Sequence, residues 1–214
     1  MRLGYYKFVI KDFLFNSFRN YKLRKHNFIG HNCKISKTAI FKGNVQIRDF
    51  VKVGTNVKLG YNVIVGSNAN INNITIGDNS HIEGGVKITG NGKGEIKIGK
   101  ECYIGVYNIL DWSDNITIGN YVHIAGPSTG LWTHSSAKQC LAGLPLKNKD
   151  IKYRPTAPIT IEDNVYIGGN CIIYPGVTIH QHSIVAPNST VTKDVNSYTM
   201  VGGITAKIIK QLNY

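Results

Sequence analysis

A six-residue hydrophobic repeat is the feature of this chain that most restricts its fold. An aliphatic or aromatic side chain occupies every sixth position from Ile29 to Ile71, and the spacing continues after small slips to Ile124. A second block with the same spacing runs from Ile161 to Val191. So short a period is typical of a parallel β-helix, in which each repeat contributes one strand to a coil, and not of helical repeats.

The other positions of the repeat agree with this interpretation. Four residues after each aliphatic comes a small or β-branched side chain, so two inward residues flank one outward residue in a three-residue strand. Gly often follows the aliphatic and Asn stands two residues later; both types tolerate positive φ in tight turns. A β-sandwich would need strands of about five or six residues and irregular turn spacing. We therefore predict one all-β domain, a parallel β-helix over residues 26–210, followed by a short tail at 211–214.

Length and cysteine usage set outer bounds on location and chemistry. The 214 residues contain no apolar run of roughly 18 residues, which a membrane span requires. Lys7 and Lys11 interrupt the only candidate secretion segment, which predicts a cytoplasmic protein. Cys33, Cys102 and Cys171 fall at inward positions, and the chain has no C-x-x-C pair, so we expect neither disulfides nor a zinc knuckle.

Charge favours an anionic partner. Twenty-five Lys and Arg against twelve Asp and Glu give a formal net charge of +13. A phosphate-bearing small molecule, a nucleic acid or a membrane surface would suit this balance. The basic residues are spread through the repeats and no nucleic-acid motif accompanies them, so we expect no nucleic acid as partner.

Residues 1–25 differ from the repeats and form a separate amphipathic helical segment in this prediction. Its apolar side chains recur at helical spacing within residues 1–20, while the basic ones lie elsewhere. Two interpretations stay open. The apolar stripe caps the end of the solenoid, or residues 1–20 attach the protein to anionic lipid at the inner face of the membrane.

The repeat stops for some thirty residues, at 131–158, and this loop is the first candidate functional segment. Long loops inside compact repeats are usually functional. His134 stands where the coil stops, and a histidine titrates near neutrality, so it has the chemistry of a general base. Taken alone, a loop histidine is more often an ordinary surface residue.

The chain after Pro158 carries the most specific motifs, "DNVYIGGN", "PGVTI", "VTKDV" and "GGITAK". This ending resembles the terminal coils of hexapeptide-repeat acyltransferases, in particular galactoside and maltose acetyltransferases and the sugar O-acetyltransferases of bacterial polysaccharide pathways. The likeness in repeat architecture covers about residues 29–210. It implies a left-handed β-helix, an exception to right-handed crossovers, assembled as a homotrimer that uses acetyl-CoA and no metal.

The resemblance also implies roles for individual residues. His134 matches the family's catalytic histidine, which deprotonates the acceptor hydroxyl as it attacks the thioester of acyl-CoA. The acceptor would be a sugar or glycan precursor, with N-acetylation of a nucleotide-linked amino sugar as the alternative. The positions that match the family's coenzyme A contacts are Tyr166, Gly169, Ala186, Pro187, Thr192, Lys193, Lys207 and Lys210.

Acceptor contacts are expected near a slip in the repeat at "LDWSDNITI". A bulge of this kind pushes side chains outward, which makes Asp111, Trp112 and Asp114 candidates. Trp132, two residues before His134, offers an aromatic face for a sugar. We assign acceptor contact to Asp111, Trp112 and Trp132, and to Arg154 in the loop.

Two alternatives to acyl transfer remain at this stage. If coils stack every three repeats, His81, Tyr103 and His123 form an outward ladder, and a zinc enzyme that hydrates carbon dioxide would use His81, His123 and His134. Zinc needs ligands converging within about 2.1 Å of the metal. A binding solenoid without chemistry is the second alternative, and it predicts no affinity for coenzyme A.

Overall fold

The computed structural model of this chain describes residues 26–213 apart from 91, 93 and 149. The amphipathic segment expected at 1–25 lies outside the described residues. In the described part no helix is long and apolar enough to cross a membrane.

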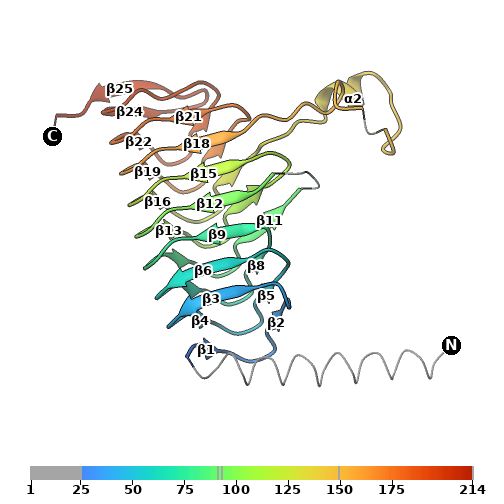
Figure 1. Ribbon diagram of the computed structural model, residues 1–214. Coiled ribbons are helices and arrows are strands. Elements are labelled where there is room, and N and C mark those ends of the chain that lie inside the picture. The colour runs from blue at the N-terminus through green and yellow to red at the C-terminus, as the bar shows by residue number, and fades with distance from the viewer. Residues whose placement is uncertain (1–25, 91, 93, 149, 214) are drawn as a thin grey trace.

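Three parallel sheets form a β-helix, as the six-residue period predicts (Figure 1). Successive strands pass from one sheet to the next, and every third strand pairs in parallel with the strand one coil below. Tyr103 of one coil, for example, pairs with His123 of the next. The first sheet contains β1 (Phe28–Ile29), β4 (Gln46–Ile47), β7 (Ile64–Val65), β10 (His81–Ile82), β13 (Tyr103–Ile104), β16 (His123–Ile124), β19 (Tyr166–Ile167), β22 (Ile184–Val185), β24 (Thr199–Gly202) and β25 (Lys207–Gln211).

The second and third sheets complete the prism. The second contains β2 (Lys34–Ile35), β5 (Lys52–Val53), β8 (Asn70–Ile71), β11 (Lys87–Thr89), β14 (Ile109–Asp111), β17 (Gly130–Leu131), β20 (Ile172–Ile173) and β23 (Thr190–Val191). The third contains β3 (Ile40–Gly43), β6 (Lys58–Tyr61), β9 (Ile74–Ile76), β12 (Ile96–Ile98), β15 (Ile116–Ile118), β18 (Ile159–Ile161) and β21 (Thr178–Ile179). Most strands have only two residues, fewer than the three expected. We name the corners in chain order: the first joins the first sheet to the second, the second joins the second to the third, and the third closes the coil.

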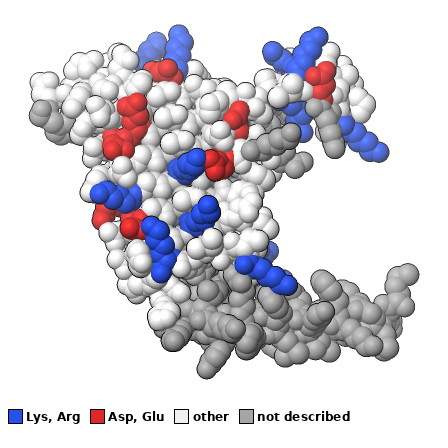
Figure 2. Space-filling model, viewed as in Figure 1, with Lys and Arg blue, Asp and Glu red and all other residues white. Residues whose placement is uncertain are grey.

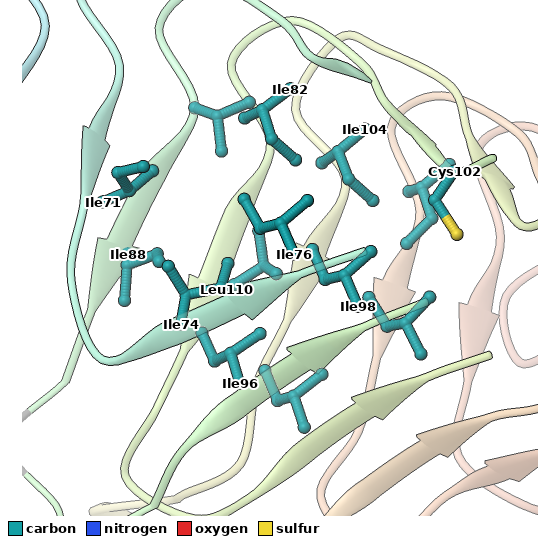
Figure 3. Packing of buried hydrophobic residues seen from close by; sticks show 14 of the residues in the cluster. Ile71, Ile74, Ile76, Ile82, Ile88, Ile96, Ile98, Cys102, Ile104 and Leu110 are labelled. Carbon is teal, nitrogen blue, oxygen red and sulfur yellow. The ribbon is translucent and has the colours of Figure 1, made fainter. Parts of the chain in front are cut away.

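The core is a column of stacked aliphatic side chains inside the three sheets (Figure 3). Ile82 and Ile104, which occupy equivalent positions in successive coils, are 1% and 0% exposed. The three inward cysteines are also buried and free, as expected. Burying one such aliphatic side chain stabilises the fold by about 1.5–3 kcal/mol. The repeat in the sequence is therefore the repeat of this column.

The turns show why Asn and Gly recur, for two different reasons. Asn44, Asn62 and Asn79 have φ near +55°, as expected, and their side chains form a hydrogen-bonded ladder along the third corner. The Gly that follows the aliphatic, however, does not have the predicted positive φ. At Gly77 a Cβ would lie 2.5 Å from the carbonyl carbon of Gly99 in the next coil. Gly is needed there because consecutive coils approach closely.

The C-terminal end departs from the coil pattern. Strand β25 turns back and pairs antiparallel with β24, beside the last coil of the first sheet. Gln211, which the sequence pattern placed in the tail, ends this strand. Figure 1 shows β25 at the top of the column, on the side away from the protruding loop that carries α2 (Ala137–Leu141).

Candidate active site

The protruding loop leaves the coil at the second corner. Strand β17 ends at Leu131 and β18 begins at Ile159, so the loop occupies the interruption seen in the sequence. His134 and Thr156 form an antiparallel bridge that closes the neck of the loop. His134 is thereby fixed where the loop joins the rigid column.

A buried carboxylate holds the imidazole of His134. The Nδ1 atom of His134 lies 2.5 Å from Oδ2 of Asp111, which belongs to β14 one coil below. The Asp111 side chain is 0% exposed, whereas the His134 side chain is 23% exposed. The carboxylate of the pair is therefore buried in the protein, and one edge of the imidazole ring reaches the surface.

Asp111 is anchored by several donors besides the imidazole. Its Oδ2 accepts the backbone N–H groups of Thr133 and His134 at 3.0 and 3.1 Å. Its Oδ1 accepts the hydroxyl of Ser113 at 2.7 Å and the Ser113 backbone N–H at 3.1 Å. Burial raises the pKa of Asp111, but the hydrogen bonds from the His134 ring and Ser113 outweigh it, so the pKa lies below its ordinary value. Asp111 is therefore ionised at neutral pH.

This arrangement determines the tautomer of His134. An ionised carboxylate only accepts hydrogen bonds, so Nδ1 carries the proton in the neutral ring. The unprotonated Nε2 is then the base of the pair. The geometry suits removal of a proton from a group held beside the ring.

The position of Asp111 corrects the expectation that it contacts the acceptor. The slip in the repeat was expected to push Asp111 outward, but its side chain points inward and both oxygens are satisfied by the chain itself. The register slip makes room for the carboxylate beneath His134. Asp111 is a positioning residue for the imidazole.

A cavity of about 730 Å³ opens beside His134 at the second corner. Ser113, Asp114 and Asn115 of one coil line it, together with Gly92 and Gly94 of the coil below. The protruding loop supplies the rest of the lining: Leu146, Lys147, Asn148, Ile151, Arg154 and Thr156. A cavity of this size lies within the range of small-molecule sites, about 300–1,000 Å³.

The structure brings some of the expected acceptor residues to this cavity and leaves others out. Arg154 lines it, as does Asp114. Trp112 and Trp132 are not among its lining residues. The Trp112 indole N–H donates to the Gly90 carbonyl at 3.2 Å and the side chain packs on the core, whereas the Trp132 ring lies against Gly130.

Sequence reasoning missed several residues of this corner. Ser113 bridges Asp111 and His134, with its hydroxyl 3.2 Å from Nδ1 of the ring. Asn115, Gly92 and Gly94 line the cavity without having been predicted. The "GNGKGE" segment at residues 90–95 was the available signal, because it breaks the six-residue period just below the slip at Asp111.

The expected coenzyme A residues lie on the last coils, but at two corners. Gly169, Ala186 and Pro187 lie at the first corner, and Tyr166 precedes them on β19. Thr192 and Lys193 follow β23 at the second corner, the corner of His134. Lys207 and Lys210 are exposed on β25, and neither forms an ion pair with a described acidic residue. The second sheet lies between the two groups.

The outward aromatic ladder expected from three-repeat stacking is present. The ring centroids of His81 and Tyr103 are 5.7 Å apart, and those of Tyr103 and His123 are 4.5 Å apart. The ladder continues to Tyr166 and belongs to the first sheet. His134 instead follows β17 of the second sheet.

Within one chain the three histidines of the zinc hypothesis lie apart. Tyr103 stands between His81 and His123 on the first sheet, and His134 is bonded to Asp111 at the second corner. Across the part of the chain that the structure describes, no three His, Cys, Asp or Glu side chains form a group that could hold a metal ion. A single chain therefore does not bring the three histidines together.

Two protein-family models match the repeats. Bacterial transferase hexapeptide (six repeats) matches residues 158–193, and the hexapeptide repeat of succinyl-transferase matches residues 51–90. The first match covers the block of six-residue spacing from Ile161 to Val191, and the second falls within the repeats that run from Ile29 to Ile124.

Curated relatives include O- and N-acetyltransferases. The galactoside O-acetyltransferase of Escherichia coli (strain K12) is 32% identical over 142 residues, which cover 65% of this chain and 64% of that protein. The 2,3,4,5-tetrahydropyridine-2,6-dicarboxylate N-acetyltransferase of Staphylococcus aureus (strain bovine RF122 / ET3-1) is 40% identical over 84 residues, 39% of this chain and 33% of that protein. The matches thus span less than two thirds of the length of these relatives.

A solved structure shows the same fold. A mutant of AntD, an N-acyltransferase from Bacillus cereus in complex with dTDP and coenzyme A, superposes with a TM-score of 0.61 at 24% identity. The match covers 75% of this chain and 86% of that one. At this identity the match shows the fold alone; the family models and the curated relatives confirm the resemblance to hexapeptide-repeat acyltransferases.

Proposed function

We propose that this hexapeptide-repeat chain is an acetyl-CoA-dependent acyltransferase that acetylates a hydroxyl of a sugar or glycan precursor in bacterial polysaccharide biosynthesis. One observation carries the proposal: the His134–Asp111 pair presents a free imidazole edge to the cavity beneath the protruding loop. The similarity to galactoside O-acetyltransferase over 65% of the chain supports this reaction class.

His134 is the only general base that the proposed reaction needs. The acceptor oxygen attacks the thioester carbonyl carbon, and His134 Nε2 takes the hydroxyl proton as the new C–O bond forms. The C–S bond then breaks, and the imidazolium returns the proton to the departing sulfur to give free coenzyme A thiol. General-base assistance of this kind contributes roughly 10²- to 10⁴-fold in rate. Asp111 stabilises the imidazolium that forms between the two proton transfers.

N-acetylation of a nucleotide-linked amino sugar is the second candidate. The 40% identity to an N-acetyltransferase over 84 residues supports transfer to nitrogen, though that relative acts on a tetrahydropyridine dicarboxylate and not on a sugar. The same Nε2 atom would then accept the proton of an attacking amine. The two candidates differ in the acceptor and share the site.

For coenzyme A we propose the groove between neighbouring solenoids of a homotrimer. Its contacts would be Tyr166, Gly169, Ala186, Pro187, Thr192, Lys193, Lys207 and Lys210. The exposure of the three lysines on the final coils supports this, because a phosphate charge gains ~1 kcal/mol from an exposed ammonium at about 4 Å. Attachment of residues 1–20 to anionic lipid, which would place the enzyme at the inner face of the membrane, also remains a proposal.

Release of coenzyme A thiol tests the proposal directly. Purified full-length protein is incubated with acetyl-CoA and a panel of sugars, amino sugars and nucleotide sugars, and free thiol is measured together with the mass of the acceptor. We expect acceptor-dependent thiol release and a product heavier by one acetyl group. Absence of both thiol release and acetyl-CoA binding would leave a non-catalytic solenoid as the better account.

A further inference from the structure

The walls of the cavity beside His134 differ in character. One wall belongs to the coils: it contains Gly92, Gly94 and the segment Ser113–Asn115. The rest of the lining comes from the protruding loop, which contributes Lys147 and Arg154 as well as His134. An acceptor in this cavity would therefore share it with the imidazole and two cationic side chains.

The coil wall is built largely of backbone. A Cβ at Gly92 would collide with the backbone of Ser113, and one at Gly94 with the backbone of Asp114. Glycine at positions 92 and 94 therefore lets the backbone there lie directly on the next coil. A larger residue at either position would force the two coils apart at the edge of the cavity.

The acidic group of the coil wall is already engaged. Asp114 Oδ2 accepts the hydroxyl of Thr156 at 2.9 Å, and its Oδ1 accepts the backbone N–H of Asn115 at 2.8 Å. Within the described residues Asp114 forms no ion pair with Lys147 or Arg154, and neither cation is paired with another acidic side chain. The two charges on the loop wall are thus available to a ligand.

The loop as a whole is basic. Residues 131–158 contain five Lys or Arg and one acidic residue, Asp150. Figure 2 shows the blue side chains of this loop at the upper right, around the segment that carries α2. A cavity roofed by such a loop attracts anions and repels cations.

We propose that the acceptor carries an oxyanion group, which Arg154 and Lys147 bind in the same cavity as His134. This inference rests on the proposed function and narrows its substrate class to phosphorylated, nucleotide-linked or carboxylated sugars, at the expense of neutral glycosides. Arg154 is the stronger contact, because it is partly buried and its planar guanidinium matches two oxygens of a phosphate or carboxylate. Lys147 is exposed and adds a single charge.

Four acceptors with the same sugar ring separate the possible sources of the charge. Wild-type protein is assayed by thiol release with a neutral methyl glycoside, the sugar 1-phosphate, the nucleoside diphosphate sugar and the corresponding uronate. We expect kcat/KM for at least one anionic acceptor to exceed that for the neutral glycoside by about tenfold or more. The preferred anion then identifies phosphate or carboxylate as the recognised group. Equal kcat/KM for neutral and anionic acceptors would overturn the inference and leave the acyltransferase function intact.

Arg154→Gln and Lys147→Gln test the two residues, with Lys138→Gln as the matched control. Lys138 is an exposed lysine of the same loop and does not line the cavity. Arg154→Gln should raise KM for the anionic acceptor by about 10- to 100-fold, with a smaller effect for Lys147→Gln. KM for acetyl-CoA and for the neutral glycoside should stay at the value of the control.

Two results would contradict the assignment of Arg154 and Lys147 to the acceptor site, and a third would refute the proposed function. An Arg154→Gln variant that behaves like Lys138→Gln would remove Arg154 from the acceptor site. A rise in KM for acetyl-CoA alone would place these cations on coenzyme A instead. A complete lack of thiol release with every acceptor, in wild-type protein, would instead refute the proposed function itself. Thermal unfolding of each variant shows whether a lost contact reflects the cavity or the stability of the loop.

Discussion

At the scale of single residues, the chemistry of the site depends on a carboxylate that no substrate reaches. The carboxylate of Asp111 accepts six hydrogen bonds from the chain around it, counting the ring of His134, and its side chain is fully buried. An unpaired buried carboxylate would be costly. The local chain is therefore organised to keep Asp111 charged and the imidazole in one tautomer.

Replacing Asp111 by Asn should remove this control while keeping the shape of the side chain. The amide presents either an N–H or a carbonyl to Nδ1, so the ring is no longer held with its proton on that atom. We expect kcat to fall by about 10²- to 10⁴-fold with little change in KM for acetyl-CoA, measured by thiol release. Asp163→Asn is the control, because Asp163 bonds Asn120 at the third corner; an equal loss in that variant would contradict the assigned role.

The lowered pKa of Asp111 also predicts how stability depends on pH. A carboxyl whose pKa is depressed by folding stabilises the native state above its unfolded pKa, about 3.9, and loses that contribution as pH falls through the folded value. Wild-type protein should therefore unfold at a higher temperature than Asp111→Asn at pH 7. The gap should narrow as the pH is lowered below about 4 in thermal scans. A gap that is constant from pH 7 to pH 3 would show that the carboxylate charge does not stabilise the fold.

At the scale of elements, the second corner determines where the pair can form. Gly90, at φ +106°, lies under Asp111, and a Cβ there would collide with Oδ1 of the carboxylate. The absence of a side chain at Gly90, before β12, thus leaves the space that Asp111 occupies at the register slip. Residues of the second corner that precede the loop in the sequence therefore already leave room for the Asp111 side chain.

Gly90→Ala tests this fit. A side chain at positive φ costs about 1–2 kcal/mol, and displacing Asp111 adds about 1–3 kcal/mol. Gly176→Ala is the matched control, since φ is +84° but the nearest atom to a Cβ, in Ala157, is 3.5 Å away. Chemical denaturation should show the larger loss for Gly90→Ala, and only that variant should lose turnover. Equal losses in both would mean that the Asp111 contact is unimportant.

The same corner shows the reach of sequence reasoning. The six-residue period predicted the three sheets, the aliphatic column and the outward ladder at His81, because each depends only on stacking equivalent positions. Sequence reasoning did not identify Asp111 as the partner of His134. A register slip decides whether Asp111 points in or out, and the six-residue period does not determine which. The sequence also does not predict that the loop lines one cavity together with Gly92 and Gly94, because this depends on how far each of them projects from the corner.

At the scale of the whole molecule, the solenoid is a rigid support for one imidazole. Each coil is hydrogen-bonded to the coils beside it and filled by buried aliphatic side chains, so the column gives the second corner a fixed base to which the neck of the loop is bonded. The basic loop then covers one side of that corner. In the proposed enzyme, the column fixes the base and the loop selects the acceptor.

Turnover of a His134→Ala variant, measured alongside its affinity for acetyl-CoA, tests the central claim most directly. The account predicts a fall in turnover of about 10²- to 10⁴-fold, with acetyl-CoA bound as tightly as by the wild-type protein. Wild-type turnover in this variant would contradict it, because no other described group at the cavity is held by a buried carboxylate as His134 is.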